Sequence, residues 1–236
     1  MKIFAVAAVC LAGAIAQSPK AALSTNVASA LKAETLHYGI NWQSGLSLGE
    51  GTITSAPGKE DLTFRMNVQA SLPGFALDEK ATAKSALGFC SASLEKEWTR
   101  GKRKGQETTT FDPTHLVAKR KTKGGGESDI SISQCGRDAL TYFFFVRREL
   151  AAGRLPATQQ VLYGAPYQSS LQYKGAQSIR VGDEMIQTDH LDAKIKGPAS
   201  EFTLEMYFAR DAVRTPLRVL IPTSLGKFSV ELLREQ

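Results

Sequence analysis

The feature that most constrains the fold of this chain is a single amphipathic helix between two series of strand-like segments. Asp138 is suited to cap this helix, because its carboxylate can accept a hydrogen bond from a first-turn amide. Gly153 suits the left-handed position that follows a helix, and Pro156 prevents continuation. Apolar residues recur between them at spacings of three and four, at Ala139, Tyr142, Phe143, Val146 and Leu150. The pattern predicts a helix over about residues 138–152.

Two aromatic residues, Phe144 and Phe145, widen the apolar face of this helix. We therefore expect the rest of the protein to cover much of the helix circumference. The polar side is expected to include Arg147, Arg148 and Glu149. Such a helix can wall an apolar cavity or pack as an ordinary core helix on a sheet. Aromatic stripes at helical spacing are usually core, which favours the second interpretation.

Apolar and polar residues alternate elsewhere in the chain, as is typical of half-buried strands. Leu36, Tyr38, Ile40 and Trp42 form the apolar face of the first such segment. Others lie at 46–55, 62–70, 89–98, 106–111, 115–121, 159–163, 167–173, 176–181, 184–195, 201–209, 217–221 and 227–233, while 78–87 fits a strand or a short helix. Strands without intervening helices pair antiparallel. We therefore expect a mainly β protein, a curved antiparallel sheet or open barrel with the helix on its concave side, as a single domain over 31–236.

The N-terminus has the pattern of a secretory signal peptide. Lys2 supplies the charged region, residues 3–14 are apolar, and Ala14-Ile15-Ala16 is a small-x-small cleavage site. The apolar run is too short to span a membrane. We expect a signal peptide over 1–16 that is cleaved after Ala16, a loose segment over 17–30, and a periplasmic or secreted protein that is at most peripheral to a membrane.

Cleavage removes Cys10 and leaves two of the three cysteines, Cys90 and Cys135. An even pair in an oxidising compartment predicts a disulfide. The alternative is a pair of free buried thiols.

The positive charge of the chain is local. Residues 96–123 hold nine basic and three acidic side chains, within a chain of formal net charge +6. The residues expected at two hairpin tips and their stems are Lys102, Arg103, Lys104, Lys119, Arg120 and Lys121. They can hold a phosphate, an anionic lipid headgroup or an acidic polymer, although a solvated face is the default interpretation. Nucleic acid is not an expected partner of an exported protein.

The search for catalytic and metal motifs yields little. Gly45-Leu46-Ser47-Leu48-Gly49 matches the GxSxG pattern, but the residues after Ser47 alternate as a strand where a nucleophile elbow needs a helix. A glycine-flanked hairpin is favoured, and a serine hydrolase is only a remote alternative. His37, His115 and His190 show no metal-ligand spacing. No catalytic residue, metal or cofactor is predicted.

Three groups of residues recur in a characteristic order and spacing. They are Glu34-x-Leu36-x-Tyr38-x-Ile40-x-Trp42 with Gly45 and Gly49; Asp138-Ala139-Leu140 with Arg147, Leu150 and Gly153; and Asp211-x-x-Arg214-x-Pro216 with Pro222 and Leu225-Gly226. In these the chain resembles domain-of-unknown-function family 3108, exported β proteins of Gram-negative bacteria. It is more distantly similar to the periplasmic lipoprotein-carrier half-barrels, in which a curved sheet wraps helices over an apolar cavity, although those carriers have more than one helix. The resemblance implies export and a β fold, and no reaction.

The functional expectation is a non-enzymatic envelope protein that binds an amphipathic or anionic, lipid-like ligand or an envelope partner. A scaffold without a small ligand is the alternative. The ligand would lie between the helical residues Tyr142, Phe143 and Val146 and the first-strand residues Tyr38 and Trp42, with the basic tips near its headgroup. Whether these faces meet or enclose a space depends on their separation. Oligomeric state is left open.

Overall fold

The computed structural model describes residues 31–72, 75–223 and 226–233, so the predicted signal peptide (1–16) and loose segment (17–30) lie outside the described residues. Within this part of the chain, no helix combines the length and the apolar character that crossing a bilayer requires. The described strands form one 15-stranded sheet, which confirms the mainly β, antiparallel fold with one helix.

The first half of the sheet is a series of antiparallel neighbours in chain order. Its strands are β1 (Glu34–Trp42), β2 (Ser47–Pro57), β3 (Asp61–Leu72), β4 (Phe75–Ala86), β5 (Ser91–Arg100), β6 (Arg103–Asp112), β7 (Val117–Thr122) and β8 (Glu127–Ser131). The short β9 (Arg137–Asp138) and the helix α1 (Ala139–Ala151) follow. The second half comprises β10 (Gln159–Leu162), β11 (Pro166–Val181), β12 (Glu184–Lys196), β13 (Glu201–Ala209), β14 (Pro216–Thr223) and β15 (Gly226–Leu232).

The two halves meet in the middle of the sheet, where β1 pairs antiparallel with β15. The outer strands are β8 at one end and β9 at the other, and β9 pairs with β10 in parallel. The order of strands is therefore two meanders joined along one pair, with the middle of the chain at both edges of the sheet.

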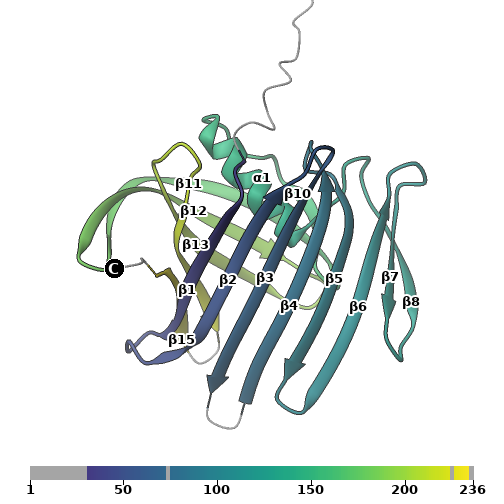
Figure 1. Cartoon of the computed structure of the whole chain (residues 1–236), viewed down its shortest axis with the longest axis horizontal. Coiled ribbons are helices and arrows are strands. Elements are labelled where there is room, and N and C mark those ends of the chain that lie inside the picture. The colour runs from purple at the N-terminus through teal and green to yellow at the C-terminus, as the bar shows by residue number, and fades with distance from the viewer. Residues whose placement is uncertain (1–30, 73–74, 224–225, 234–236) are drawn as a thin grey trace, which may run out of the picture.

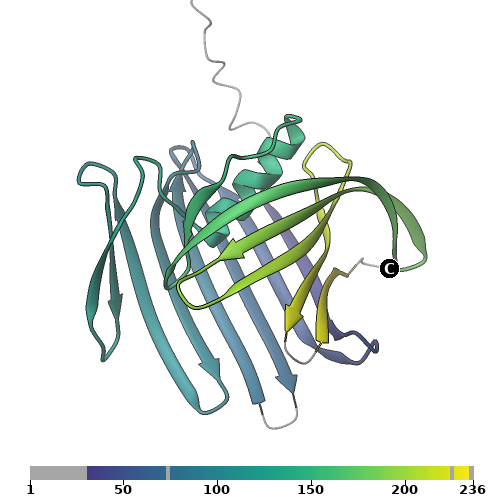
Figure 2. The ribbon, with the colours of Figure 1, turned by 180° about the vertical axis from the view of Figure 1, so that it is seen from behind.

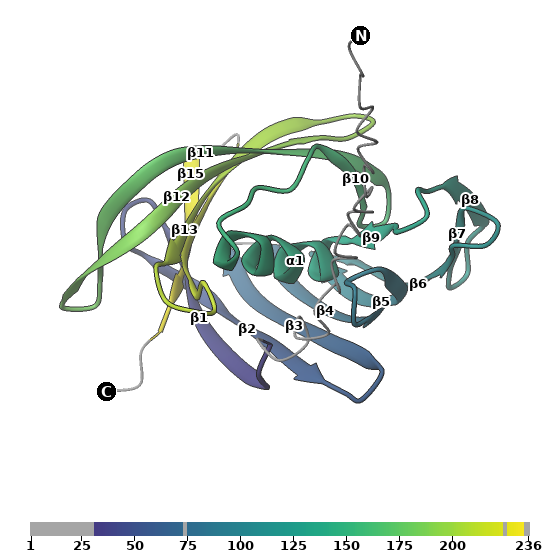
Figure 3. The ribbon, with the colours of Figure 1, turned by 90° about the horizontal axis from the view of Figure 1, so that it is seen from above.

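The sheet curls strongly, and α1 lies inside the curve. Figure 3 shows the helix between a wall formed by β1–β5 and a wall formed by β10–β13. On the first side Phe144 stacks on Phe64 of β3, with 4.2 Å between ring centroids. On the second side Val146 and Leu150 pack in a separate apolar cluster with Leu191 and Phe208. The helix therefore occupies the concave side of the sheet, as predicted, and divides its interior into two apolar clusters.

The ends of the helix follow the predicted signals. The Asp138 carboxylate accepts a hydrogen bond from the Thr141 amide at 3.0 Å, and Gly153 adopts a φ of 69°. The prediction that Arg147 belongs to the polar side was wrong. Arg147 is only 3% exposed and forms an ion pair with Glu34 at the start of β1. Helical periodicity cannot predict an ion-pair partner that is so distant in the sequence.

The predicted disulfide is present between Cys90 and Cys135, whose Cα atoms lie 4.8 Å apart. It ties the turn before β5 to the segment before β9. Beside it, the Ser91 amide donates a hydrogen bond to the Gly136 carbonyl at 2.9 Å. These links bring the β9 end of the sheet against β5, so that β6, β7 and β8 extend beyond the contact (Figure 1). The sheet is curled but not closed.

For the ambiguous segment 78–87 the strand alternative is observed, since residues 78–86 lie in β4. The strands differ from the sequence expectations in two other places. The two segments expected at 167–173 and 176–181 are one strand, β11, whose register shifts between Tyr173 and Gly175. The sequence analysis missed β8, because an exposed edge strand with the sequence ESDIS lacks apolar alternation.

Candidate functional site

An apolar cavity of about 280 Å³ lies between α1 and the wall formed by β10–β13. This wall is seen in front of the helix in Figure 2. The cavity is lined by Ala139, Tyr142, Phe143, Val146, Val161, Tyr163, Tyr167, Ser169, Leu171, Ala193, Ile195, Phe202, Leu204 and Met206. Hydroxyl groups provide the polar side-chain atoms of this lining, and two of them, on Ser169 and Tyr142, hydrogen-bond to each other at 3.3 Å.

The cavity follows from two periodicities. Residues 139, 142, 143 and 146 form one stripe of the helix, and alternate residues of β12 and β13 face that stripe. Space remains because small side chains, Ala139 and Ala193, stand where larger ones would fill the gap. The lining makes the cavity suitable for an apolar group rather than for a charged one.

Three of the predicted ligand-binding residues, Tyr142, Phe143 and Val146, line this cavity. Tyr38 and Trp42 do not. The Tyr38 hydroxyl donates a hydrogen bond to the Pro216 carbonyl at 3.0 Å, and Trp42 packs edge-on against Phe228 with 4.6 Å between ring centroids. The sequence analysis paired the helical stripe with β1, but the strand order places it opposite β10–β13.

A buried charged cluster adjoins the cavity at Tyr163. The Tyr163 ring lies 3.9 Å from the Lys96 ammonium, and its hydroxyl donates to Glu79. Lys96 and Glu107, each 5% exposed, form an ion pair of 2.9 Å, and Glu107 also binds Arg120 at 2.8 Å. The β10–β11 turn thus rests on a polar patch of β4–β7.

The protonation states within this cluster have clear causes. Burial disfavours charge on Glu107, but Lys96 and Arg120 outweigh it and hold the pKa of Glu107 below its ordinary value. Burial and the Glu79 carboxylate raise the pKa of Tyr163, so its hydroxyl stays protonated and donates. The Glu107 carboxylate is therefore kept charged by its two cationic partners.

The basic segment is divided by strand alternation. Lys96 and Arg120 face inward, whereas Lys119 and Lys121 lie on the opposite face of the sheet, where Lys121 pairs with Glu127 at 2.7 Å. Lys119, Arg120 and Lys121 belong to β7, a stem of the β6–β7 hairpin.

Lys102, Arg103 and Lys104 lie at the β5–β6 turn, as predicted. Figure 1 shows that this turn is at the opposite end of the sheet from α1. The structure therefore does not bring these basic side chains to the apolar cavity.

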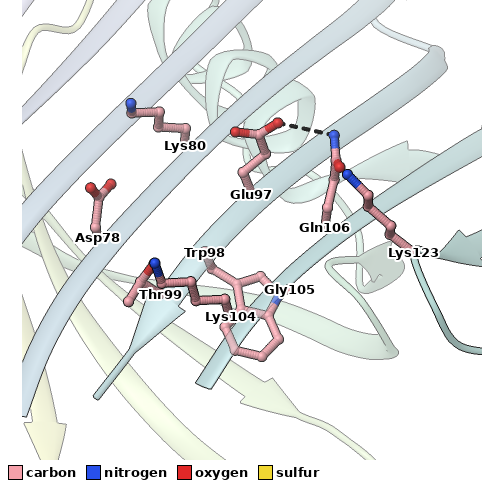
Figure 4. Close-up of a pocket in the computed structure, with 9 residues that line it drawn as sticks. All are labelled: Asp78, Lys80, Glu97, Trp98, Thr99, Lys104, Gly105, Gln106 and Lys123. Atoms are coloured by element: carbon pink, nitrogen blue, oxygen red, sulfur yellow. Dashed lines mark hydrogen bonds between the residues drawn. The ribbon is translucent and has the colours of Figure 1, made fainter. Parts of the chain in front are cut away.

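The outer face of β4–β6 carries a shallow hollow of mixed charge (Figure 4). Lys80, Lys104 and Lys123 surround it together with the carboxylates of Asp78 and Glu97. The Glu97 carboxylate accepts a hydrogen bond from the side-chain amide of Gln106 at 2.9 Å. Opposite charges on neighbouring strands offset each other, so this face is not a uniformly basic patch.

The structure assigns the GxSxG segment to a hairpin. Ser47 is the first residue of β2, and no helix follows it. The residues that the structure describes include no group of three or more His, Cys, Asp or Glu side chains that could hold a metal ion. His115 instead contacts Asp112 at 2.6 Å in the β6–β7 turn.

The three groups of residues on which the family resemblance rests meet beside α1. Arg147 binds Glu34, and its Nε donates to the Arg214 carbonyl at 3.1 Å. Tyr38 reaches Pro216 in the same region. Arg214 adopts a φ of 53°, which is uncommon for a residue other than glycine. These residues join β1, α1 and the β13–β14 turn, a structural role that sequence spacing did not reveal.

Comparisons with known proteins give a family and a fold. A family model described as "Protein of unknown function (DUF3108)" matches residues 35–233. No curated protein matches the chain. A similar solved structure is the crystal structure of a beta-barrel-like protein of domain of unknown function DUF1849 from Brucella abortus, with a TM-score of 0.61 and 7% sequence identity, covering 86% of this chain and 97% of that one. At this identity the likeness concerns the fold alone.

Proposed function

Because the chain belongs to the DUF3108 family of proteins of unknown function, we propose its role from the geometry of the cavity. It is a non-enzymatic binding protein that holds the apolar part of an amphipathic, lipid-like ligand between α1 and β10–β13. The observation that supports this role is the space of about 280 Å³ beside the helical stripe, lined by apolar side chains and a few hydroxyls. A core helix packed at normal density would leave no such space.

The energetics favour an alkyl chain. Each methylene transferred from water into such a lining contributes about 0.8 kcal/mol. The cost of association is on the order of 4–15 kcal/mol. About five methylenes therefore offset its lower end, and about nineteen its upper end.

The proposal includes export to the cell envelope. It rests on the Lys2 charge, the apolar run and the Ala14-Ile15-Ala16 site. N-terminal sequencing of protein from the producing cell should begin at Gln17, and retention of Lys2 would contradict it.

Ligand binding is tested with a fluorescent fatty acid titrated into the mature protein. Leu204→Trp fills the cavity from β13, and Thr203→Trp places the same side chain on the exposed, opposite face of that strand as a matched control. Leu204→Trp should weaken binding at least tenfold and Thr203→Trp should leave it unchanged. Absence of saturable binding to the wild type, or equal loss in both variants, would leave the scaffold as the better account.

A further inference from the structure

A second cavity, of about 590 Å³, lies along another flank of α1. Its apolar part includes Phe89, Phe144 and Val213. It is also lined by Arg148, Glu149 and Ala151 of the helix, by the C-cap Ala152, and by Arg154 beyond the helix end. The helical residues that line it, at 144, 147, 148, 149 and 151, lie on a different side of the helix from those at the first cavity, 139, 142, 143 and 146. The two cavities are therefore separate places with different chemistry.

Cations outnumber carboxylates at this second cavity. The Glu149 carboxylate binds Arg148 at 2.8 Å through one oxygen and Arg154 at 2.8 Å through the other. One negative charge thus serves two guanidinium groups. Arg147 also lines the cavity, but its charge is matched by Glu34.

A further guanidinium, that of Arg137, is not among the residues that line the cavity but contacts the same Phe145 ring as Arg148. The Arg137 guanidinium lies 3.8 Å from the centroid of the Phe145 ring, and the Arg148 guanidinium lies 4.7 Å from the same centroid. Arg148 also lies 4.7 Å from the centroid of the Phe89 ring. One terminal nitrogen of Arg137 donates to the side-chain carbonyl of Gln159 at 2.6 Å, whereas its Nε is buried without a hydrogen-bond acceptor in the described part of the chain. Burial and the nearby Arg148 charge both lower the pKa of Arg137.

We propose that this second cavity binds an anionic, phosphate-bearing amphiphile, with the phosphate at Arg148 and Arg154, next to Arg137, and the apolar chain over Leu31, Ala151 and Val213. Three guanidinium groups against one carboxylate leave two positive charges, which matches a phosphate better than a neutral headgroup. Guanidinium forks also fit phosphate oxygens in a bidentate manner. Leu31, Ala151 and Val213 supply the apolar surface that inorganic phosphate would not use.

The test compares lysophosphatidylglycerol, lysophosphatidylcholine and inorganic phosphate by calorimetry, below the micellar concentration of each lipid. The test uses the mature protein carrying Leu204→Trp, which fills the first cavity. Any lipid that still binds then occupies the second cavity, so the result does not depend on whether the first cavity binds a ligand. Lysophosphatidylglycerol should bind at least tenfold more tightly than lysophosphatidylcholine, with weaker binding at high salt. Equal binding of the two lipids, or equally tight binding of inorganic phosphate, would overturn the assignment.

Charge-matched variants locate the site. Arg137→Gln with Arg148→Gln should remove the preference for the anionic lipid, whereas Lys102→Gln with Lys104→Gln, at the β5–β6 turn, should keep it. Arg154 is 61% exposed, so Arg154→Gln is expected to fold normally and to reduce the preference severalfold. Retention of the full preference in the arginine variants, or its loss in the lysine control, would refute the proposed position.

Discussion

Replacing Glu107 by Gln removes the negative charge from a buried pair and is the most informative single perturbation of this fold. Lys96 is 5% exposed, and the carboxylate at ion-pair distance from it is that of Glu107, at 2.9 Å. The variant therefore leaves an ammonium group buried without a counter-charge. Breaking a buried pair in this way costs about 3–5 kcal/mol, because the remaining charge has lost both water and its partner.

The reciprocal change is expected to be milder. In Lys96→Met, Glu107 keeps Arg120, whose Nε and a terminal nitrogen donate at 3.0 and 2.8 Å. We expect that variant to lose roughly 1–2 kcal/mol. The double variant should be more stable than Glu107→Gln alone, because no ammonium is then buried and Arg120 can turn toward solvent.

Urea unfolding at pH 7, followed by tryptophan fluorescence, measures these differences. Glu107→Gln should also lower Tm by about 10 °C, since 1 kcal/mol corresponds to roughly 2–4 °C in a domain of this size. Lys121→Met is the control, because Lys121 and its partner Glu127 are 64% and 69% exposed and little change is expected. Equal losses in Glu107→Gln and Lys96→Met, or a double variant less stable than both, would refute the argument from unequal partners.

Other perturbations test separate features of the fold. Cys135→Ala should destabilise the oxidised protein by about 4 kcal/mol, since the disulfide to Cys90 closes a sequence separation of 45 residues, and should have little effect under reducing conditions in chemical denaturation. Gly105→Ala would place a Cβ 2.4 Å from the Trp98 ring, so it should shift the tryptophan emission and cost about 1–3 kcal/mol. The lowered pKa of Glu107 stabilises the fold above the ordinary carboxyl pKa, and this contribution is lost as pH falls through the lowered value. Acid titration of Glu107→Gln should lack that component, and an unchanged acid profile would contradict it.

The features that the sequence predicted correctly depend on residues that are close together in the chain, on period-two alternation, or on an even number of cysteines. The limits of α1 follow from a cap, a glycine and a proline, which act within one turn of the helix ends. The strands follow from period-two alternation. The disulfide follows from the two cysteines that remain after cleavage. Its position beside the hydrogen bond between Ser91 and Gly136 was not predicted.

The features that sequence reasoning missed depend on sheet order. Nothing near the helix indicates that its stripe faces Ala193 and Leu204 rather than Tyr38, because that depends on β1 pairing with β15. Alternation could have placed Lys96 inward, since it shares parity with the buried Leu94. The run of basic residues masked that signal, because a charged segment is usually interpreted as a solvated one.

The pairing of β1 with β15 has a consequence for how the chain is made. The neighbours of β2–β8 lie one turn away in the sequence, so these strands can pair before the second half of the chain is available. The edge of β1 from Tyr38 to Trp42 must wait for residues 228–232. Until then it is an open template for another chain, and the apolar face of α1 lacks the wall that β11–β13 provide. A lesion in β15 should therefore reduce yield through aggregation of unfinished molecules more than it changes the finished one.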